Sequence, residues 1–196
     1  GENVGTWSNL AYTGNTAEYT RGIRISGVVD GALFDGNVFT ETREPSDAGI
    51  TLGNALSNVT LSNNLLDTVW AVDGIRIEGA SAENVVIEDN RIHDFYADGS
   101  RSAIAIMAPG TGNLVQRNEI VQDLSRADNV DLPANLFNHW AVYVWPAASA
   151  ASAGDTVGWS ILNNEIDGYQ GTANAPIVHN AVGKLLVTGN TFGAQT

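Results

Sequence analysis

The sequence predicts an all-β chain that forms a right-handed single-stranded parallel β-helix, a solenoid of about six coils. Two observations carry this prediction. An asparagine with apolar neighbours at fixed offsets recurs along the chain, and short runs of alternating residues stand between its copies. A unit that repeats every 20 to 50 residues or so is typical of stacked repeat architectures. No segment combines a helical period with capping residues.

The asparagine repeat sets the length of one coil. Its spacing is 26 to 28 residues, with one interval of 46. The residues three before and two after each asparagine are apolar in every copy, so we expect them to fill the interior of the stack. We expect the asparagine itself to occupy a sharp corner with left-handed backbone, and its side-chain amide to hydrogen-bond the neighbouring coils. The ladder asparagines are Asn37, Asn64, Asn90, Asn118, Asn164 and Asn190.

Runs with a period of two precede the asparagines and predict short, half-buried strands. They are GIRISG (22–27), GITLGN (49–54), GIRIEG (74–79), AIAIMA (103–108), AVYVWP (141–146) and a weaker copy, PIVHNA (176–181). Each coil is therefore expected to hold two or three strands. We expect residues 1–20 to be an N-terminal edge or cap segment and residues 21–196 to be the β-helix. Two insertions, at 122–140 and 146–158, account for the long interval.

Composition and charge narrow the classes of function. Acidic residues outnumber basic ones 22 to 9, for a formal net charge of −13, and the basic residues are scattered, which argues against a nucleic-acid partner. No apolar run of about 18 residues occurs, so no membrane span is expected. Cysteine is absent, which excludes disulfides and thiolate chemistry. The chain begins with glycine, so we expect a processed product or part of a longer secreted or surface protein.

These coils resemble the parallel β-helix repeats of the pectate-lyase-like superfamily and of the carbohydrate-binding and sugar-hydrolysis domains, over roughly residues 20 to 192. The pattern is specific for fold and uninformative about function, because such folds include lyases, hydrolases, epimerases, tailspikes and non-catalytic modules. The resemblance implies an extracellular protein with a polysaccharide partner.

The outward positions of the alternating strands form the candidate binding surface. Alternation places Arg24, Thr51, Arg76 and Ala105 in one outward row that ends at Tyr143. The resemblance implies that this face lines a sugar groove in which arginine pairs with uronate carboxylates. The alternative is that the aromatic residues pack the insertions and the arginines are merely solvated. The substrate-binding candidates are Arg24, Arg76, Trp140, Tyr143 and Trp145.

The catalytic candidates are weaker. A uronate lyase needs a base and a group that neutralises the carboxylate, either arginine or calcium, and calcium is therefore a possible cofactor. The candidates are Asp73, Asp98, His139 and Arg76; Asp47 and Asp131 are further loop acids, and no dedicated metal site is predicted. A hydrolase would need paired carboxylates, which acids on adjacent coils could supply.

The dipeptide His93-Asp94 invites the interpretation of a catalytic acid/base pair. Its slot holds varied residues in the other coils, so we expect a solvated turn instead.

We expect few coils and no helical cap, which favours a module over a complete enzyme. The prediction is an extracellular module that binds or displays toward polysaccharide. The alternatives are a uronate-polysaccharide lyase, epimerase or hydrolase, and a structural spacer of an adhesin or tailspike. Open ends would also permit end-to-end self-association or contact with neighbouring domains.

Overall fold

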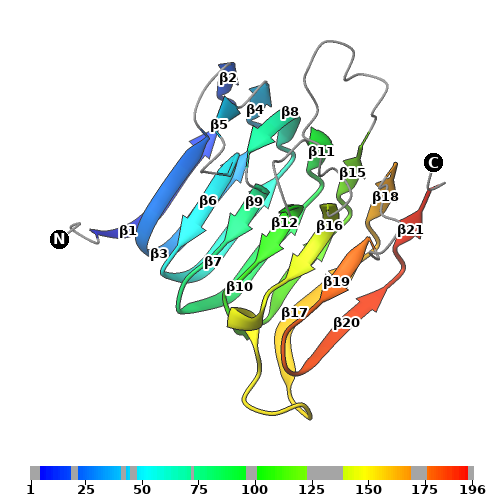
Figure 1. The fold of residues 1–196 in the computed structure, drawn as a ribbon. Coiled ribbons are helices and arrows are strands. Elements are labelled where there is room, and N and C mark those ends of the chain that lie inside the picture. Colours follow the sequence, from blue (N-terminus) through cyan, green and yellow to red (C-terminus); the bar gives the residue numbers. More distant parts are fainter. Residues whose placement is uncertain are drawn as a thin grey trace.

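The computed structural model describes residues 5–18, 22–40, 43–44, 48–71, 73–95, 101–122, 139–168 and 176–193. Regular structure in these ranges is β-strand, apart from one 3-10 turn, η3 (Pro146–Ala148). Every strand pairing is parallel, and the strands stack rung upon rung along one axis (Figure 1). The chain is a right-handed parallel β-helix. No helix in the described ranges is both long enough and apolar enough to span a bilayer.

The strands form three faces. Sheet A holds β1 (Gly5–Thr13), the second half of β3 (Ile23–Asp35), β7 (Ala55–Ser62), β10 (Ser81–Glu88), β14 (Asn113–Gln116), β17 (Thr156–Leu162) and β20 (Lys184–Thr188), with β13 (Gly110–Thr111) beside β10. Sheet B holds β2 (Thr16–Glu18), β4 (Val38–Thr40), β8 (Leu65–Ala71), β11 (Arg91–Phe95), β15 (Glu119–Val121), β18 (Glu165–Asp167) and β21 (Thr191–Phe192), with β5 (Arg43–Glu44) beside β8. Sheet C holds the first half of β3, β6 (Ile50–Gly53), β9 (Asp73–Ile77), β12 (Arg101–Ile106), β16 (His139–Val144) and β19 (Ile177–His179).

The core follows the asparagine register. Residues three before each ladder asparagine stack as neighbours on sheet A, as Leu61 does on Ile87, and both are fully buried. Residues two after it stack on sheet B, as Ile92 does on Ile120. The predicted interior rows are therefore confirmed in the middle of the stack, where each coil covers the next.

The asparagine ladder is confirmed, and its hydrogen bonds are regular. The backbone N–H of Asn64 donates to Asn90 Oδ1 (3.0 Å), and Asn64 Nδ2 donates to the same oxygen (2.9 Å). Asn64 Nδ2 also donates to the carbonyl oxygen of Phe34 in the preceding coil (2.9 Å). The same pattern recurs from Asn37 to Asn190 and links each buried amide to the coils on both sides.

The predicted left-handed backbone at the ladder asparagines is wrong. Positive φ falls on the residue before each of them: Gly36, Asn63, Asp89, Arg117, Asn163 and Gly189. That preceding residue makes the corner, and in the middle coils it points to solvent, as Asn63 does, while Asn64 stays buried. The corner and the ladder therefore fall on two neighbouring residues. The physical reason is that the ladder asparagine must direct both its N–H and its side chain along the stack axis.

The N-terminal segment joins the solenoid as its edge. β1 pairs with β3, and β2 pairs with β4, so the described part of residues 1–20 forms a first, shorter coil. Asn15 extends the ladder by donating to Asn37 Oδ1 from both its N–H and its Nδ2, each at 3.0 Å. Much of the insertion at 122–140 lies outside the described residues. The insertion at 146–158 begins with η3 and leads into β17.

Candidate functional site

The predicted outward row of sheet C exists. Strand register places Arg24 beside Thr51, Thr51 beside Arg76, Arg76 beside Ala105 and Ala105 beside Tyr143. We call these five residues the sheet C row. Their exposure differs from the expectation of an open face, because Thr51, Ala105 and Tyr143 are all buried. Arg24, on the first strand of sheet C, is the exposed member, so most of the row is covered.

Arg76, a half-buried residue at the centre of the row, forms an ion pair with the buried Asp73. Arg76 Nε and Nη2 lie 2.7 and 2.6 Å from Asp73 Oδ2. The backbone N–H and the hydroxyl of Ser102 donate to Asp73 Oδ1, at 3.0 and 2.9 Å. Burial raises the pKa of the Asp73 carboxyl, and Arg76 and Ser102 oppose this shift. Both carboxylate oxygens are therefore occupied within the fold, and this geometry is that of a link between two coils.

The arginines of the row are joined by Glu78. Glu78 Oε1 accepts a hydrogen bond from Arg24 Nη2 at 2.8 Å, and its Oε2 lies 3.8 Å from Arg76 Nη1. Glu78 reaches two coils back because it passes over Gly53, where a Cβ would lie 3.3 Å from Glu78 Cγ. The two arginines thus face two carboxylates, those of Asp73 and Glu78, and the formal charges of this cluster cancel.

Three aromatic rings gather at the other end of the row. Trp140 stacks on Tyr143 with ring centroids 4.4 Å apart, and Trp145 meets Tyr143 edge-on at 5.0 Å. Asn180 Nδ2 donates to the Tyr143 hydroxyl at 3.3 Å. The side chain of Trp145 is 40% exposed, and its backbone N–H is fixed by the carbonyl oxygen of Ile106 (2.8 Å). We call Trp140, Tyr143 and Trp145 the aromatic cluster.

Among the described residues of sheet C, three buried polar atoms have no hydrogen-bond partner: Thr51 Oγ1, Trp140 Nε1 and His179 Nδ1. A buried polar atom without a partner costs roughly 1 to 3 kcal/mol, so these atoms lower the stability of the fold, and none of them is open to a ligand at the surface. Thr51 lies between the two arginines in the row, and Trp140 lies in the aromatic cluster.

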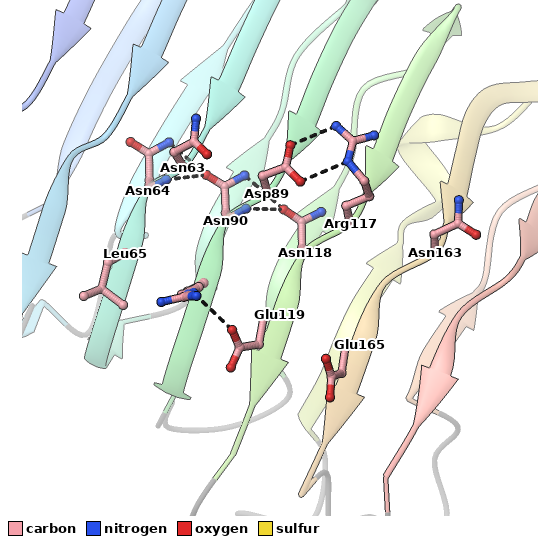
Figure 2. A pocket seen from close by; sticks show the side chains of 11 residues that line it. Asn63, Asn64, Leu65, Asp89, Asn90, Arg117, Asn118, Glu119, Asn163 and Glu165 are labelled. Carbon is pink, nitrogen blue, oxygen red and sulfur yellow. Dashed lines mark hydrogen bonds and ion pairs between the residues drawn. The ribbon is translucent and has the colours of Figure 1, made fainter.

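A hollow with a volume of about 620 Å³ lies where sheets A and B meet (Figure 2). We call it the corner groove. Arg117 binds Asp89 through two nitrogens, at 2.9 and 2.8 Å, and Glu88 at 2.6 Å. These carboxylates, Asp89 before Glu88, raise the pKa of the Arg117 guanidinium. The lining residues are Asn63, Asn64, Leu65, Asp89, Asn90, Arg91, Arg117, Asn118, Glu119, Asn163 and Glu165.

On sheet B, His93 lies on a strand, and the predicted turn is wrong. His93 belongs to β11, where it pairs with Asp67 of β8 and with Val121 of β15. The same position is therefore part of a strand in both neighbouring coils. His93 Nε2 lies 3.2 Å from Glu119 Oε1, and Arg91 Nε lies 3.1 Å from Glu119 Oε2. These contacts link His93 and Arg91 of β11 to Glu119 of the adjacent coil.

The sequence did not predict the corner groove, although a signal for it was present. Glu88 and Asp89 stand directly before the ladder asparagine Asn90. In the next coil, Gln116 and Arg117 stand at the same two positions before the ladder asparagine. Gln116 Nε2 donates to Glu88 at 2.8 Å, as Arg117 does at 2.6 Å. The first coils repeat the device, because Ser62 and Asn63 donate to Asp35.

Several predicted site residues are not placed. Asp47, Asp98 and Asp131 lie outside the described residues, and only the backbone of His139, at the start of β16, is described. Among the described residues, no group of three or more His, Asp or Glu side chains is arranged to hold a metal ion. No protein-family model matches the chain, and a search of curated proteins found no match either.

Proposed function

We propose that this chain is an extracellular β-helix module that binds polysaccharide through the aromatic cluster. The observation that carries the proposal is Trp145, a partly exposed ring whose position is fixed by Tyr143 and by a backbone hydrogen bond. An indole ring offers a flat apolar surface for the C–H face of a sugar, and its low conformational freedom reduces the entropic cost of binding.

The charge distribution favours a neutral polysaccharide as the ligand. Arg24 and Arg76 already pair with Glu78 and Asp73, so a uronate carboxylate would have to compete with these internal carboxylates for the two guanidinium groups. A net charge of −13 would also repel a polyanionic chain at low salt. The uronate-directed enzyme therefore has less support than the binding module. The relationship to the pectate-lyase-like superfamily is part of the same proposal and is supported by the stacked asparagine ladder.

The test compares two exposed tryptophans. Binding to xylan, mixed-linkage β-glucan, dextran and polygalacturonate is measured by affinity electrophoresis and calorimetry. Trp145→Ala is expected to weaken binding to a neutral polysaccharide about 30-fold, equivalent to about 2 kcal/mol. Trp7→Ala, which removes a 47% exposed ring from the N-terminal coil, should leave affinity unchanged.

The outcomes separate the candidate functions. Equal affinity of Trp145→Ala and the unmodified chain would refute the aromatic cluster as the binding site. Binding confined to polygalacturonate, with ultraviolet absorbance from an unsaturated product, would establish the lyase instead. Absence of binding to all four polysaccharides would leave the structural spacer as the better account.

A further inference from the structure

The corner groove runs along the stack between two columns of side chains (Figure 2). One column consists of the corner residues from Asn63 to Asn163. The other consists of the first outward residue of each sheet B strand, from Leu65 to Glu165. The groove thus extends over three steps of about 4.8 Å each. Every residue that lines it lies on an inner coil, with a further described coil on either side.

Most charges in the corner groove are paired within it. In the corner column, Arg117 holds Asp89 through two nitrogens, at 2.9 and 2.8 Å. In the sheet B column, Arg91 Nε lies 3.1 Å from Glu119 Oε2. Glu165 differs, because no hydrogen bond or ion pair engages its carboxylate in the part of the chain that the structure describes. The groove therefore carries one uncompensated negative charge, at Glu165.

Glu165 also stands beside a like charge. Strand register sets it directly against Glu119 of the preceding coil, and at a strand spacing of about 4.8 Å the two carboxylates repel each other. On the other side of Glu119 the register sets a base, Arg91, against the acid. The dashed lines in Figure 2 reach neither Glu165 nor the side-chain amide of Asn163, two residues before it. This part of the groove therefore has acceptors and donors to offer to a ligand, and a deficit of positive charge.

The lining indicates the class of ligand. A volume of about 620 Å³ lies within the usual range of small-molecule sites, roughly 300 to 1,000 Å³. Apart from Leu65, the lining side chains are amides, carboxylates and guanidinium groups, which suit hydroxyl groups because a hydroxyl both donates and accepts. The unpaired carboxylate of Glu165 requires a cation as well. A ligand with hydroxyl groups and an ammonium group meets both conditions.

We propose that the corner groove binds a saccharide that carries protonated amino groups, such as an oligomer of glucosamine. An ammonium group lies between Glu119 and Glu165, and the hydroxyl groups bond the exposed amides of Asn63 and Asn163. The net charge of −13 attracts such a ligand from a distance. This site goes beyond the neutral polysaccharide proposed for the aromatic cluster, because that cluster lies on sheet C and the groove lies where sheets A and B meet.

Two trimers that differ in charge test the proposal. The isotope-labelled chain is titrated with a trimer of glucosamine and, separately, with its fully N-acetylated form, and the side-chain signals are followed by NMR. The glucosamine trimer should shift the amide signals of Asn63 and Asn163, and the uncharged N-acetylated trimer should not. Contact at the aromatic cluster would shift the indole signal of Trp145 instead, so failure at one site is distinguishable from failure at the other. An equal response of the groove amides to both trimers, or to neither, would refute the proposal.

Glu165→Gln and Glu83→Gln form a matched pair of variants. Glu83 is an exposed acid of sheet A outside the groove, so both substitutions change the net charge equally. Glu165→Gln should weaken binding of the glucosamine trimer about tenfold or more, as expected when one charge-assisted hydrogen bond is lost. Glu83→Gln should leave the affinity unchanged. Equal weakening by both substitutions would mean that the ligand responds to the overall charge of the chain, and the groove would lose its role.

Two further measurements separate a ligand site from a structural contact. Since Glu165→Gln removes the repulsion from Glu119, it should raise the urea midpoint slightly while the affinity falls. A lowered midpoint would show that the Glu165 carboxylate stabilises the fold, which contradicts the proposal. A peptide of three lysines supplies ammonium groups without sugar hydroxyls and should bind more weakly than the glucosamine trimer. If the peptide shifted the groove amides as strongly, the site would recognise charge alone and the saccharide would be the wrong ligand.

Discussion

Replacing Asn90 by alanine tests how much the ladder contributes to stability. Asn90 is fully buried, and its Oδ1 accepts two hydrogen bonds from Asn64, at 3.0 and 2.9 Å. Its Nδ2 donates to Asn118 Oδ1 and to Leu61 O, at 3.0 and 2.9 Å. Alanine removes all of these bonds. The buried N–H of Asn64 is then left without a partner, whereas Asn64 Nδ2 keeps its bond to Phe34 O.

The magnitude follows from these contacts. One buried N–H without a partner costs roughly 1 to 3 kcal/mol, and each of the other lost bonds contributes roughly 0.5 to 1.5 kcal/mol. Because the lost bonds share partners, the sum is best taken as about 3 to 5 kcal/mol of the free energy of unfolding. A loss of this size is a large part of the stability of a small domain, which is about 5 to 15 kcal/mol.

The assay is urea unfolding followed by circular dichroism, with Asn190→Ala as the matched control. Asn190 makes the same bonds to the preceding coil but is partly exposed, so water can replace its amide. We expect Asn190→Ala to cost about 1 kcal/mol. If Asn90→Ala cost no more than Asn190→Ala, burial would not amplify the ladder bonds and the reasoning would fail.

The remaining predictions concern the core, the Asp73–Arg76 ion pair and the loss of stability at acidic pH. Ile87→Ala, in the middle of the interior row, should lower the free energy of unfolding by about 2 to 5 kcal/mol, and an unchanged urea midpoint would contradict the alignment of the coils. Arg76→Met leaves Asp73 buried without its cation and should cost about 3 to 5 kcal/mol at pH 7. Without Arg76 the pKa of Asp73 is raised further, so the folded state binds the proton of this carboxyl more tightly than the unfolded state does. The loss of unfolding free energy caused by Arg76→Met should therefore shrink as the pH falls toward 3.8. A loss that does not change with pH would refute this. Hydrogen bonds from Asn63 and Ser62 hold the pKa of Asp35 below 3.8. The Asp35 carboxylate therefore stabilises the folded state above that pH, and this stabilisation is lost as the pH falls through the lowered pKa. Asp35→Asn should therefore reduce the decline in melting temperature between pH 5 and pH 3, measured by scanning fluorimetry, and an unaltered decline would count against that role.

Much of the fold was predictable because the same pattern of asparagine and apolar residues recurs in each coil. Tyr12 and Ala17 flank Asn15 at the offsets of the other coils, yet the step from Asn15 to Asn37 is shorter than the rest, and a search at a fixed spacing passes over it. The error at the corners arose because glycine, asparagine, aspartate and arginine all occupy the left-handed position. Nothing in a single coil marks Asp89 or Arg117 as the corner residue.

The candidate site was less predictable. Alternation correctly placed Arg24, Arg76 and Tyr143 in one row, since side-chain direction in a strand has a period of two. It could not give their exposure, which depends on what covers the face. Nor could it show that Glu78 crosses Gly53 to reach Arg24, because that contact joins residues two coils apart.

The sequence alone determined the path of the chain, the interior residues and the ladder, because a solenoid is built from nearest-neighbour contacts that recur at a constant spacing. Only the tertiary structure decided which charges pair, that Tyr143 is buried while Trp145 is exposed, and that the inward residues of the last coil remain uncovered. The physical reason is that these properties belong to contacts between coils and to the ends of the stack. Side-chain reach and the presence of a next coil determine them, and neither is encoded in the period of the repeat.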